Sequence, residues 1–277
     1  MKRFSDKLTF VVFTYNEEKR IERVIKNFIH SGAVLIVDNH STDGTVRIAE
    51  QHGCKVLLNK NQGWVEDEVT AQRVKDAVQT PWIYWAYADE MLERKTLDHL
   101  VETIESDQYS VISMARKNYY YGRFLHDAFI ARLTRVFKKE AVDFTGNRIH
   151  HFGRVTVASD KVYQMPSDYF VHHFISNTAE SYVASLNRYS TIEATASGAP
   201  RHIVLKLLRV GVNFVTNYAF RGAWRAGVAG FYVSFFQLFY ELLSHMKSLE
   251  KARAISSANI ESTHDVARDE ILRGLQP

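Results

Sequence analysis

Polar and acidic residues gather at three places in the first third of the sequence, each time directly after an apolar segment. They are Thr14-Tyr15-Asn16-Glu17, the segment from Asp38 to Thr45, and Asp89-Glu90. A carboxylate at the end of a strand can accept hydrogen bonds from a nucleotide base or a ribose. The segment from Asp38 to Thr45 is equally suited to a polar turn that caps a following helix. The residues alone leave both interpretations open.

The segments around these clusters alternate between strand-like and helix-like patterns. Continuous apolar runs predict buried strands, and apolar residues spaced by three and four predict helices. The expected strands are 8–13, 33–37, 55–58 and 82–87, and the expected helices are 17–31, 45–52 and 65–78. This alternation predicts right-handed βαβ crossovers and a mainly parallel sheet flanked by helices. Since ligands of such sheets bind beyond the carboxyl ends of the strands, the three clusters should converge on one cleft.

The composition is that of an ordinary globular protein, with 277 residues, 46% of them hydrophobic and 24% charged. A net charge of +4 suits anionic partners such as phospholipid head groups, nucleotides or nucleic acid without choosing among them. The single cysteine, Cys54, excludes an internal disulfide and argues against a cysteine-based zinc site. The polar N-terminal residues show no signal peptide, so we expect a protein of the cytosol or the cytosolic face of a membrane.

The first two clusters, with the strands before them, resemble the beginning of family 2 glycosyltransferases. The segments that carry this resemblance are Phe10–Glu18 and Val37–Thr45. Tyr87-Ala88-Asp89-Glu90 is similar to the Asp-Ala-Asp-Glu of a subgroup related to lipopolysaccharide core glycosyltransferases. Weaker similarities to that subgroup follow at Ala71-Gln72-Arg73 with Trp82, Arg148–His151, Val171–Phe174, Leu186–Ser190 and Arg221–Phe231. The resemblance covers about residues 8–250 and implies the GT-A fold.

The resemblance also implies the ligands. It points to a nucleotide-sugar donor, with UDP as the expected nucleotide, and places Thr14, Glu17 and Asp38 at the uracil and ribose. The full set of residues expected to bind substrate is Thr14, Tyr15, Asn16, Glu17, Asp38 and Arg73. Asp89 is expected to bind a divalent cation, Mg²⁺ or Mn²⁺, that stabilises the charge growing on the diphosphate. His172 or His173 would complete the site or bind the diphosphate, and His173 is our candidate metal ligand.

An inverting transfer requires a base that takes the proton of the acceptor hydroxyl. Related sequences have a carboxylate where this chain has His151, and a histidine can serve because its unperturbed pKa lies near neutrality. The candidates are His150 and His151, with Glu90 and Asp143 as further possibilities. Adjacent residues of an extended segment point to opposite sides, so one of the two histidines should face the cleft. Ordinary surface or core histidines are the other interpretation.

Basic residues in the central region could attract an anionic acceptor or could be ordinary solvated charges. They are Arg116, Lys117, Arg132 and Arg135.

The chain changes character near residue 196. We predict a GT-A-like domain over residues 1–195 and a helical, membrane-proximal or oligomerisation region with a polar tail over residues 196–277. The segment 227–243 contains one charge, Glu241, and its aromatic residues favour a position at a membrane surface. Basic residues before it would favour an anionic cytoplasmic leaflet. Contact between two copies of the chain, a membrane span and a buried core helix are the alternatives.

Together these features predict an inverting glycosyltransferase on the inner face of the cell membrane. It would move a sugar from a nucleotide-sugar donor to a lipid- or polysaccharide-linked acceptor of bacterial envelope synthesis, with no nucleic acid as partner. A nucleotidyltransferase is one alternative, although the residues Thr14–Glu17 lack the glycine that such enzymes have after the first strand. A non-catalytic scaffold is another, because Tyr87 and His151 replace carboxylates of the resembled family.

Overall fold

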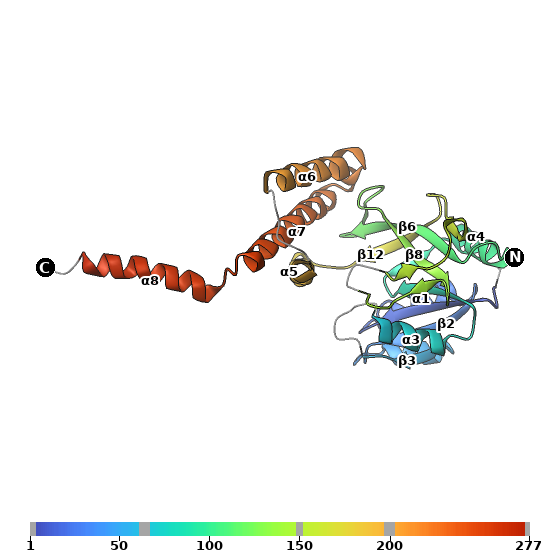
Figure 1. Ribbon diagram of the computed structural model, residues 1–277. Helices are drawn as coiled ribbons and strands as arrows, with labels where there is room; N and C mark the ends of the chain where they lie inside the picture. The colour runs from blue at the N-terminus through green and yellow to red at the C-terminus, as the bar shows by residue number, and fades with distance from the viewer. Residues whose placement is uncertain (1–3, 61–66, 148–151, 197–202, 275–277) are drawn as a thin grey trace. The chain divides into compact units, whose positions relative to one another are not determined.

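The computed structural model describes residues 4–60, 67–147, 152–196 and 203–274 (Figure 1). Contacts divide the chain into two compact units, Met1–Ser176 and Asn177–Pro277. Helix α5 (Ala179–Ala196) packs on α7 (Val228–Ala252) within the second unit, although the sequence analysis assigned it to the first domain. Each unit is described by itself below.

The first unit is built on a ten-stranded sheet whose main path has the order β3-β2-β1-β4-β8-β6-β12-β5. Strands β7 and β11 both pair with β6, and β9 and β10 form a separate two-stranded ribbon. The strands are β1 Leu8–Thr14, β2 Ala33–Asp38, β3 Lys55–Leu58, β4 Trp82–Tyr87, β5 Glu90–Leu92, β6 Val111–Tyr120, β7 Arg123–Phe124, β8 Ala131–Lys138, β9 Val142–Asp143, β10 Arg154–Val155, β11 Val162–Gln164 and β12 Phe170–Ile175. The helices are α1 Ile21–Phe28, α2 Thr45–Gln51, α3 Glu68–Ala77 and α4 Arg94–Glu105, with a short 3₁₀ turn at Ser159–Lys161.

The first four strands are parallel, as the alternating pattern predicts. β1 lies between β2 and β4, with Thr14 opposite Asp38 and Phe13 opposite Tyr87. The carboxyl ends of these three strands therefore meet at one edge of the sheet. The remaining strands add antiparallel pairs, including β4 with β8 and β5 with β12. The second pair brings the turn after β4 next to a strand from the end of the unit.

Both faces of the sheet are covered, which explains why the first strands are apolar throughout. On β1, Phe10 and Val12 belong to the core under α1 and α4, and Val11 belongs to the core under α3. The ring of Phe10 stacks on Phe28 of α1, with 4.5 Å between centroids. On the other face, Trp85 stacks on Phe13 at the same centroid distance. The period of two along each strand thus divides the apolar residues between two cores.

Helix α1 begins at Ile21, four residues later than predicted. The backbone N–H groups of Glu17 and Glu18 donate to side chains of the loop after β2, to Thr45 Oγ1 at 2.7 Å and Asp43 Oδ2 at 3.1 Å. These bonds hold the residues before Ile21 in a turn that contacts the loop after β2, so these residues do not continue the helix toward the N-terminus.

The second unit consists of helices. α6 (Ile203–Val215) continues as a π-helical segment, Thr216–Phe220, and a 3₁₀ turn, Ala223–Ala226, leads into α7. A Cβ atom at Gly230 would lie 1.8 Å from the carbonyl oxygen of Ala223, so glycine is required for this turn to pack on α7. The tail, expected to be loosely held, forms helix α8 (Ser257–Arg273), which is exposed along its whole length.

In the part of the chain that the structure describes, one helix is long and apolar enough to cross a membrane by length and composition. It is the segment Ile203–Phe220, and only 6% of it is buried. The segment 227–243, in which the sequence analysis placed the membrane contact, forms the N-cap and the first part of α7 and exposes Phe231, Tyr232 and Phe235.

Replacing Phe10 by alanine should strongly destabilise the first unit. Phe10 is fully buried between Phe28 and Tyr84, so its loss leaves a cavity that costs about 3–5 kcal/mol of unfolding free energy. Urea denaturation, followed by the fluorescence of the buried Trp82 and Trp85, measures this change. The control is Phe4→Ala, whose ring is 53% exposed and whose loss should change stability by less than about 0.5 kcal/mol. Equal effects of the two variants would contradict this account of the core.

Candidate active site

The carboxylate of Asp38 joins the ends of β1 and β2. It is fully buried and accepts hydrogen bonds from Thr14 Oγ1 (2.9 Å), Ser41 N (2.7 Å) and Ser41 Oγ (2.6 Å). Both of its oxygen atoms are therefore used within the protein. Thr14 lies opposite Asp38 in the last register pair of β1 with β2, and it is also buried. Contact of Asp38 with a nucleotide, as the sequence analysis expects, would require these bonds to be exchanged.

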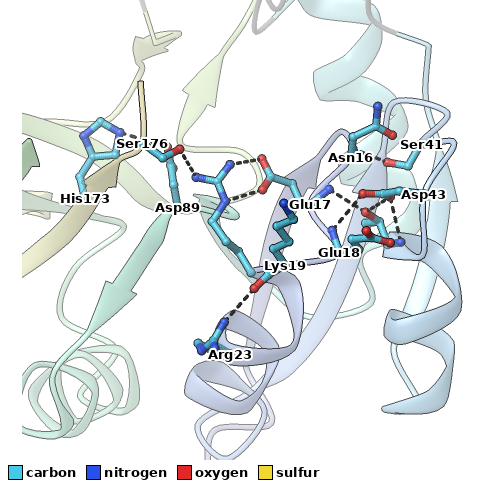
Figure 2. Close-up of polar contacts among 12 residues, drawn as sticks. Asn16, Glu17, Glu18, Lys19, Arg23, Ser41, Asp43, Asp89, His173 and Ser176 are labelled. Atoms are coloured by element: carbon cyan, nitrogen blue, oxygen red, sulfur yellow. Dashed lines mark hydrogen bonds and ion pairs between the residues drawn. The ribbon is translucent and has the colours of Figure 1, made fainter. Parts of the chain in front are cut away.

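The loop after β1 and the loop after β2 are further linked through Asn16. Its backbone N–H donates to Ser41 Oγ at 2.8 Å (Figure 2). Its Oδ1 accepts from Thr42 N, also at 2.8 Å. Asn16 has a φ of 55°, in the left-handed region that asparagine adopts more readily than most residues. This conformation lets the backbone and side chain of Asn16 both reach the second loop.

Asp43 closes the second loop at the start of α2. It accepts from Thr45 N at 3.0 Å and Thr45 Oγ1 at 2.5 Å, and Gly44 N donates to Glu18 Oε2 at 2.9 Å. Burial alone would raise the pKa of Asp43, but the hydrogen bonds from Thr45 and from the Glu18 backbone hold it below its ordinary value. Asp43 thus fixes the polar turn onto Thr45, the first residue of α2, whereas the N-cap itself is Gly44.

Glu17 forms a two-pronged ion pair with Arg20, one turn along the chain. The Arg20 Nε and Nη2 atoms lie 2.6 and 2.7 Å from the two Glu17 carboxylate oxygens. Arg20 also donates to Ser176 Oγ at 3.0 Å, which places the end of the first unit beside the loop after β1 (Figure 2). Burial raises the pKa of Glu17, against the opposing effect of Arg20. Next to it, the ring of Tyr15 is 43% exposed.

Asp89 and His173 lie together at the end of β4. The register of β5 with β12 sets His173 opposite Glu90, and this brings His173 Nε2 to 3.3 Å from Asp89 Oδ2 (Figure 2). The other ring nitrogen, Nδ1, lies 2.7 Å from Asn118 Oδ1. The Asn118 amide nitrogen is occupied by Phe129 O, which orients its oxygen toward the histidine.

This arrangement fixes the tautomer of a neutral His173. Nδ1 must donate to Asn118, so the lone pair of Nε2 faces the carboxylate of Asp89. His173 Nε2 and Asp89 Oδ2 would then repel each other. A proton on Nε2, or a cation bound by both side chains, removes this repulsion. Burial alone would raise the pKa of Asp89, but the hydrogen bond and charge of His173, with Arg20 and Arg116, lower it below the ordinary value. The Asp89 carboxylate is therefore charged at neutral pH.

Glu90 has a different setting from its neighbour Asp89. Its side chain is 1% exposed, and its Oε1 atom lies 3.0 Å from Arg135 Nη1 and 3.6 Å from Arg116 Nη1. A buried carboxylate held between two guanidinium groups cannot approach an acceptor hydroxyl. These partners argue against Glu90 as the catalytic base that the sequence analysis considers. The guanidinium group of Arg135 also lies over the ring of Tyr87, 4.6 Å from its centroid. Tyr87, which stands where the resembled sequences have an aspartate, therefore makes a cation–π contact with Arg135.

The other predicted residues are placed as follows. Arg73 on α3 donates to Asn59 Oδ1 at 2.7 Å and Leu58 O at 2.9 Å, at the end of β3. Asp143 accepts from Thr145 N and pairs with Arg154 at 2.8 Å; the hydrogen bonds from Thr145 and Arg154 lower its pKa well below the ordinary range. A carboxylate with a lowered pKa is a weak base, which does not suit proton abstraction. His150 and His151 lie outside the described residues.

His172 points away from its neighbour. Its Nδ1 lies 3.0 Å from Tyr119 Oη and its Nε2 lies 3.3 Å from Glu93 Oε1. Burial lowers the pKa of His172, against the opposing effect of Glu93. Of the two adjacent histidines, His173 is therefore the one beside Asp89.

Sequence reasoning missed the residues that support the site from other strands. Asn118 on β6 orients His173, and Arg20 holds Glu17. The spacing of three between Glu17 and Arg20 was a visible signal, whereas nothing near Asn118 in the sequence indicates its partner. Over the residues that the structure describes, no group of three or more histidine, cysteine, aspartate or glutamate side chains could hold a metal ion.

A family model described as Glycosyl transferase family 2 matches residues 9–161, more than half of the chain. The chain belongs to this family. This family 2 glycosyltransferase is therefore an enzyme of the predicted class, and its fold is the predicted GT-A-like α/β fold, which sets the nucleotidyltransferase alternative aside.

Three known proteins illustrate the similarity. An uncharacterized glycosyltransferase of Rickettsia felis is 29% identical over 206 residues, which cover 68% of this chain and 69% of the relative. The lipopolysaccharide core biosynthesis glycosyltransferase LpsC of Rhizobium meliloti is 22% identical over 265 residues, covering 92% of this chain and 96% of LpsC. The mannosyltransferase PcManGT of Pyrobaculum calidifontis, solved with GDP-Man and Mn²⁺, is similar with a TM-score of 0.44 and 16% identity, covering 95% of this chain and 81% of that one.

Replacing Asp38 by alanine should destabilise this family 2 glycosyltransferase by about 2–4 kcal/mol. The change leaves the buried donors of Thr14 and Ser41 without an acceptor. Urea denaturation measures the loss, with Glu50→Ala on the exposed face of α2 as the control, for which a change of less than about 0.5 kcal/mol is expected. If Asp38→Ala leaves stability unchanged and abolishes nucleotide binding, Asp38 is a ligand of the donor rather than a support of the two loops.

Proposed function

We propose that this enzyme transfers a sugar, with inversion, from a nucleoside diphosphate sugar to a saccharide acceptor. The observation that carries the proposal is the Asp89–His173 pair at the end of β4, beside the two interlocked loops that follow β1 and β2. A nucleoside diphosphate sugar needs a site for its negatively charged diphosphate. The Asp89–His173 pair lies at the carboxyl ends of the parallel strands, where ligands of such sheets bind. UDP is the nucleotide we propose first.

Asp89 and His173 fit a divalent cation, Mg²⁺ or Mn²⁺. They offer one carboxylate oxygen and one imidazole nitrogen 3.3 Å apart, about the separation of neighbouring ligands bound at roughly 2.1 Å. Asn118 orients the imidazole as supporting residues do around metal-bound histidines. A bound cation would stabilise the negative charge of the departing diphosphate. Phosphate oxygens and water would complete its coordination, so two protein ligands suffice.

Positive charge near this pair would assist the same step. Arg20 and Arg116 are close enough to Asp89 to lower its pKa, and Arg135 lies behind Tyr87. These guanidinium groups favour the developing charge of a nucleoside diphosphate without bearing a proton that could be lost. The exposed ring of Tyr15 offers a stacking surface for a base, and Arg73 lies at the end of β3 on the same edge of the sheet.

The proposed base is His150 or His151. Glu90 and Asp143, the other candidates, are each paired with arginine. The resemblance given by the sequence places His151 where related sequences have a carboxylate, which supports this proposal.

We propose a lipid- or polysaccharide-linked acceptor of the bacterial envelope. LpsC carries the name of a lipopolysaccharide core enzyme and matches this chain over nearly its whole length. This supports an acceptor of that class, and we propose that the reaction takes place at the cytoplasmic face of the cell membrane.

The polarity of α6 supports a membrane surface as partner. Lys206 and Asn213 face α7, where they lie 3.0 and 3.3 Å from the Glu241 carboxylate. Leu205, Leu208 and Val212 are instead more than 60% exposed. Arg209 is exposed as well, and Val210 is buried. An exposed apolar surface that carries a basic residue suits the interface of an anionic bilayer. We therefore infer that α6 rests in the interface of an anionic bilayer; contact between two copies of the chain is the alternative.

Asp89→Asn should weaken UDP binding in the presence of Mn²⁺ and lower sugar transfer at least about 100-fold. The change removes the charge that would hold the cation, while His173 and its neighbours stay in place. Calorimetric titration with UDP, with and without Mn²⁺, measures the coupling between metal and nucleotide. Asp107→Asn, an exposed aspartate paired with Lys138, is the matched control and should behave as the wild type. Metal-independent binding of UDP that survives in Asp89→Asn would exclude this metal site.

Leu205→Gln with Leu208→Gln should reduce binding to vesicles of phosphatidylglycerol and phosphatidylcholine at least about tenfold. Each change removes an exposed leucine from the apolar face of α6, and each buried leucine is worth about 1.5–3 kcal/mol. Co-sedimentation measures the binding, with pure phosphatidylcholine vesicles as the uncharged comparison. Ile271→Gln with Leu272→Gln in α8 is the control pair. Unchanged vesicle binding, together with the loss of a dimer in solution, would instead assign this face to contact between copies.

A further inference from the structure

The turn that joins α6 to α7 presents two aromatic and two basic side chains to solvent (Figure 1). Phe220, at the end of the π-helical segment, is 82% exposed, and Trp224 in the 3₁₀ turn is 53% exposed. Arg221 and Arg225, each next to one of these rings in the sequence, are exposed as well. We call these four residues, Phe220, Arg221, Trp224 and Arg225, the α6–α7 tip.

The backbone of the α6–α7 tip has a fixed conformation. Gly222 precedes the 3₁₀ turn with a φ of 85°, in the left-handed region that favours glycine. The backbone N–H of Arg225 donates to Gly222 O at 3.1 Å, and the turn packs on α7 beside Gly230. Ala223 and Ala226 are buried. The small residues thus take the inner positions of the turn, which leaves the aromatic and basic side chains outside.

The tip sets an indole ring and a positive charge side by side. The guanidinium group of Arg225 lies 5.7 Å from the centroid of the Trp224 ring, within the range of a cation–π contact. Tryptophan is enriched where an apolar medium meets water, because its ring is apolar and its N–H is polar. Arginine presents a planar fork of donors that matches the oxygen atoms of a phosphate group.

The sequence around the tip carries charge of one sign. Residues 194–240 contain five basic residues and no aspartate or glutamate. Lys206 pairs with Glu241, whereas neither Arg221 nor Arg225 has an acidic partner among the residues that the structure describes. A surface with unpaired positive charge attracts an anionic partner.

Exposed apolar side chains beside the tip distinguish between anionic partners. Val215 is 50% exposed and Val228 is 64% exposed, next to the almost fully exposed Phe220. Nucleic acid offers phosphates but no apolar medium for valine side chains, whereas an anionic bilayer offers both. A symmetric contact between two copies would bring one positively charged tip against another, and repulsion opposes it. The tip therefore fits an anionic membrane surface better than nucleic acid or a second copy.

We propose that the α6–α7 tip is a binding site for the head groups of anionic phospholipids. Phe220 and Trp224 enter the head-group region of the bilayer, and Arg221 and Arg225 donate hydrogen bonds to lipid phosphates. The inference rests on the membrane partner proposed for α6. It adds a second contact, which selects the lipid by its charge.

The test measures co-sedimentation of the full chain with vesicles of phosphatidylglycerol and phosphatidylcholine. Arg221→Gln with Arg225→Gln should weaken this binding about tenfold or more, because each basic residue near an anionic surface adds to the attraction. Binding to pure phosphatidylcholine vesicles should be weaker and should not change in this variant.

The matched control removes the same charge at the other end of α7. Lys251→Gln with Arg253→Gln should lower vesicle binding less than about twofold. The 25 residues of α7 separate these positions from the tip by roughly 35 Å, several Debye lengths at physiological salt. Circular dichroism should show the same helix content in both double variants and the wild type.

Trp224 allows a second measurement that does not depend on charge. The part of the fluorescence that is lost in Trp224→Phe belongs to Trp224. That part should shift to shorter wavelength on vesicle binding, and phospholipids brominated near the head-group end of the acyl chains should quench it. Trp224→Phe itself should retain vesicle binding, because it keeps an aromatic ring at this position.

The outcomes separate the tip from the other proposals. Equal vesicle binding of the wild type and Arg221→Gln with Arg225→Gln, or Trp224 fluorescence that brominated lipids leave unchanged, overturns the tip as a lipid site. Binding that is then lost in Leu205→Gln with Leu208→Gln leaves the contact through α6 standing. Absence of any vesicle binding overturns both membrane contacts, whereas the titration with UDP still decides the transfer reaction. A dimer in light scattering that Phe220→Gln with Trp224→Gln dissociates would make the tip a contact between copies and the inference wrong.

Discussion

The site depends on one buried carboxylate that ties two strand ends together. Asp38 closes β2 and accepts from Thr14 at the end of β1 and from Ser41 in the following loop, so neither loop can move without the other. Parallel strands are not joined by a hairpin that would fix their ends relative to each other. Here the Asp38 carboxylate fixes them, because it accepts hydrogen bonds from both loops. Because the acceptor is out of water, losing one donor costs more than the same bond would at the surface. The position of the donor-facing loops is thereby set before any ligand binds.

The remaining acids at this edge differ in what neutralises them, and that difference gives them different chemistry. Glu17 is paired with Arg20, and Glu90 with Arg135 and Arg116; these cations keep their protons under all ordinary conditions. Asp89 is paired with the imidazole of His173, whose Nε2 atom can carry either a proton or a lone pair. A metal ion can replace that proton but cannot replace an arginine. Among the carboxylates described at this edge, Asp89 is therefore the one suited to exchange its partner for a cation.

The bounds of the strands could be predicted from the sequence more accurately than the partners of individual side chains. Strands 55–58 and 82–87 were predicted with the bounds they have, because uninterrupted apolar runs leave little choice of conformation. The convergence of three polar clusters followed from the parallel order alone. The setting of Glu90 did not follow, since its inward direction on β5 and its partners on β6 and β8 depend on strand pairing far along the chain. The same holds for the orientation of His173 by Asn118.

The second unit shows how a helix partner gives a role to an isolated charge. The segment 227–243, for which the sequence analysis proposes a position at a membrane surface, contains the single charge Glu241. In the structure Lys206 and Asn213 of α6 occupy that carboxylate, so the charge belongs to a contact between helices. Those two residues face α7, whereas Leu205, Leu208 and Val212 of α6 are exposed. α7 also exposes apolar side chains, among them Phe231 and Phe235. Which side chains of each helix are exposed depends on the pairing of the two helices, and the sequence pattern alone does not give that pairing.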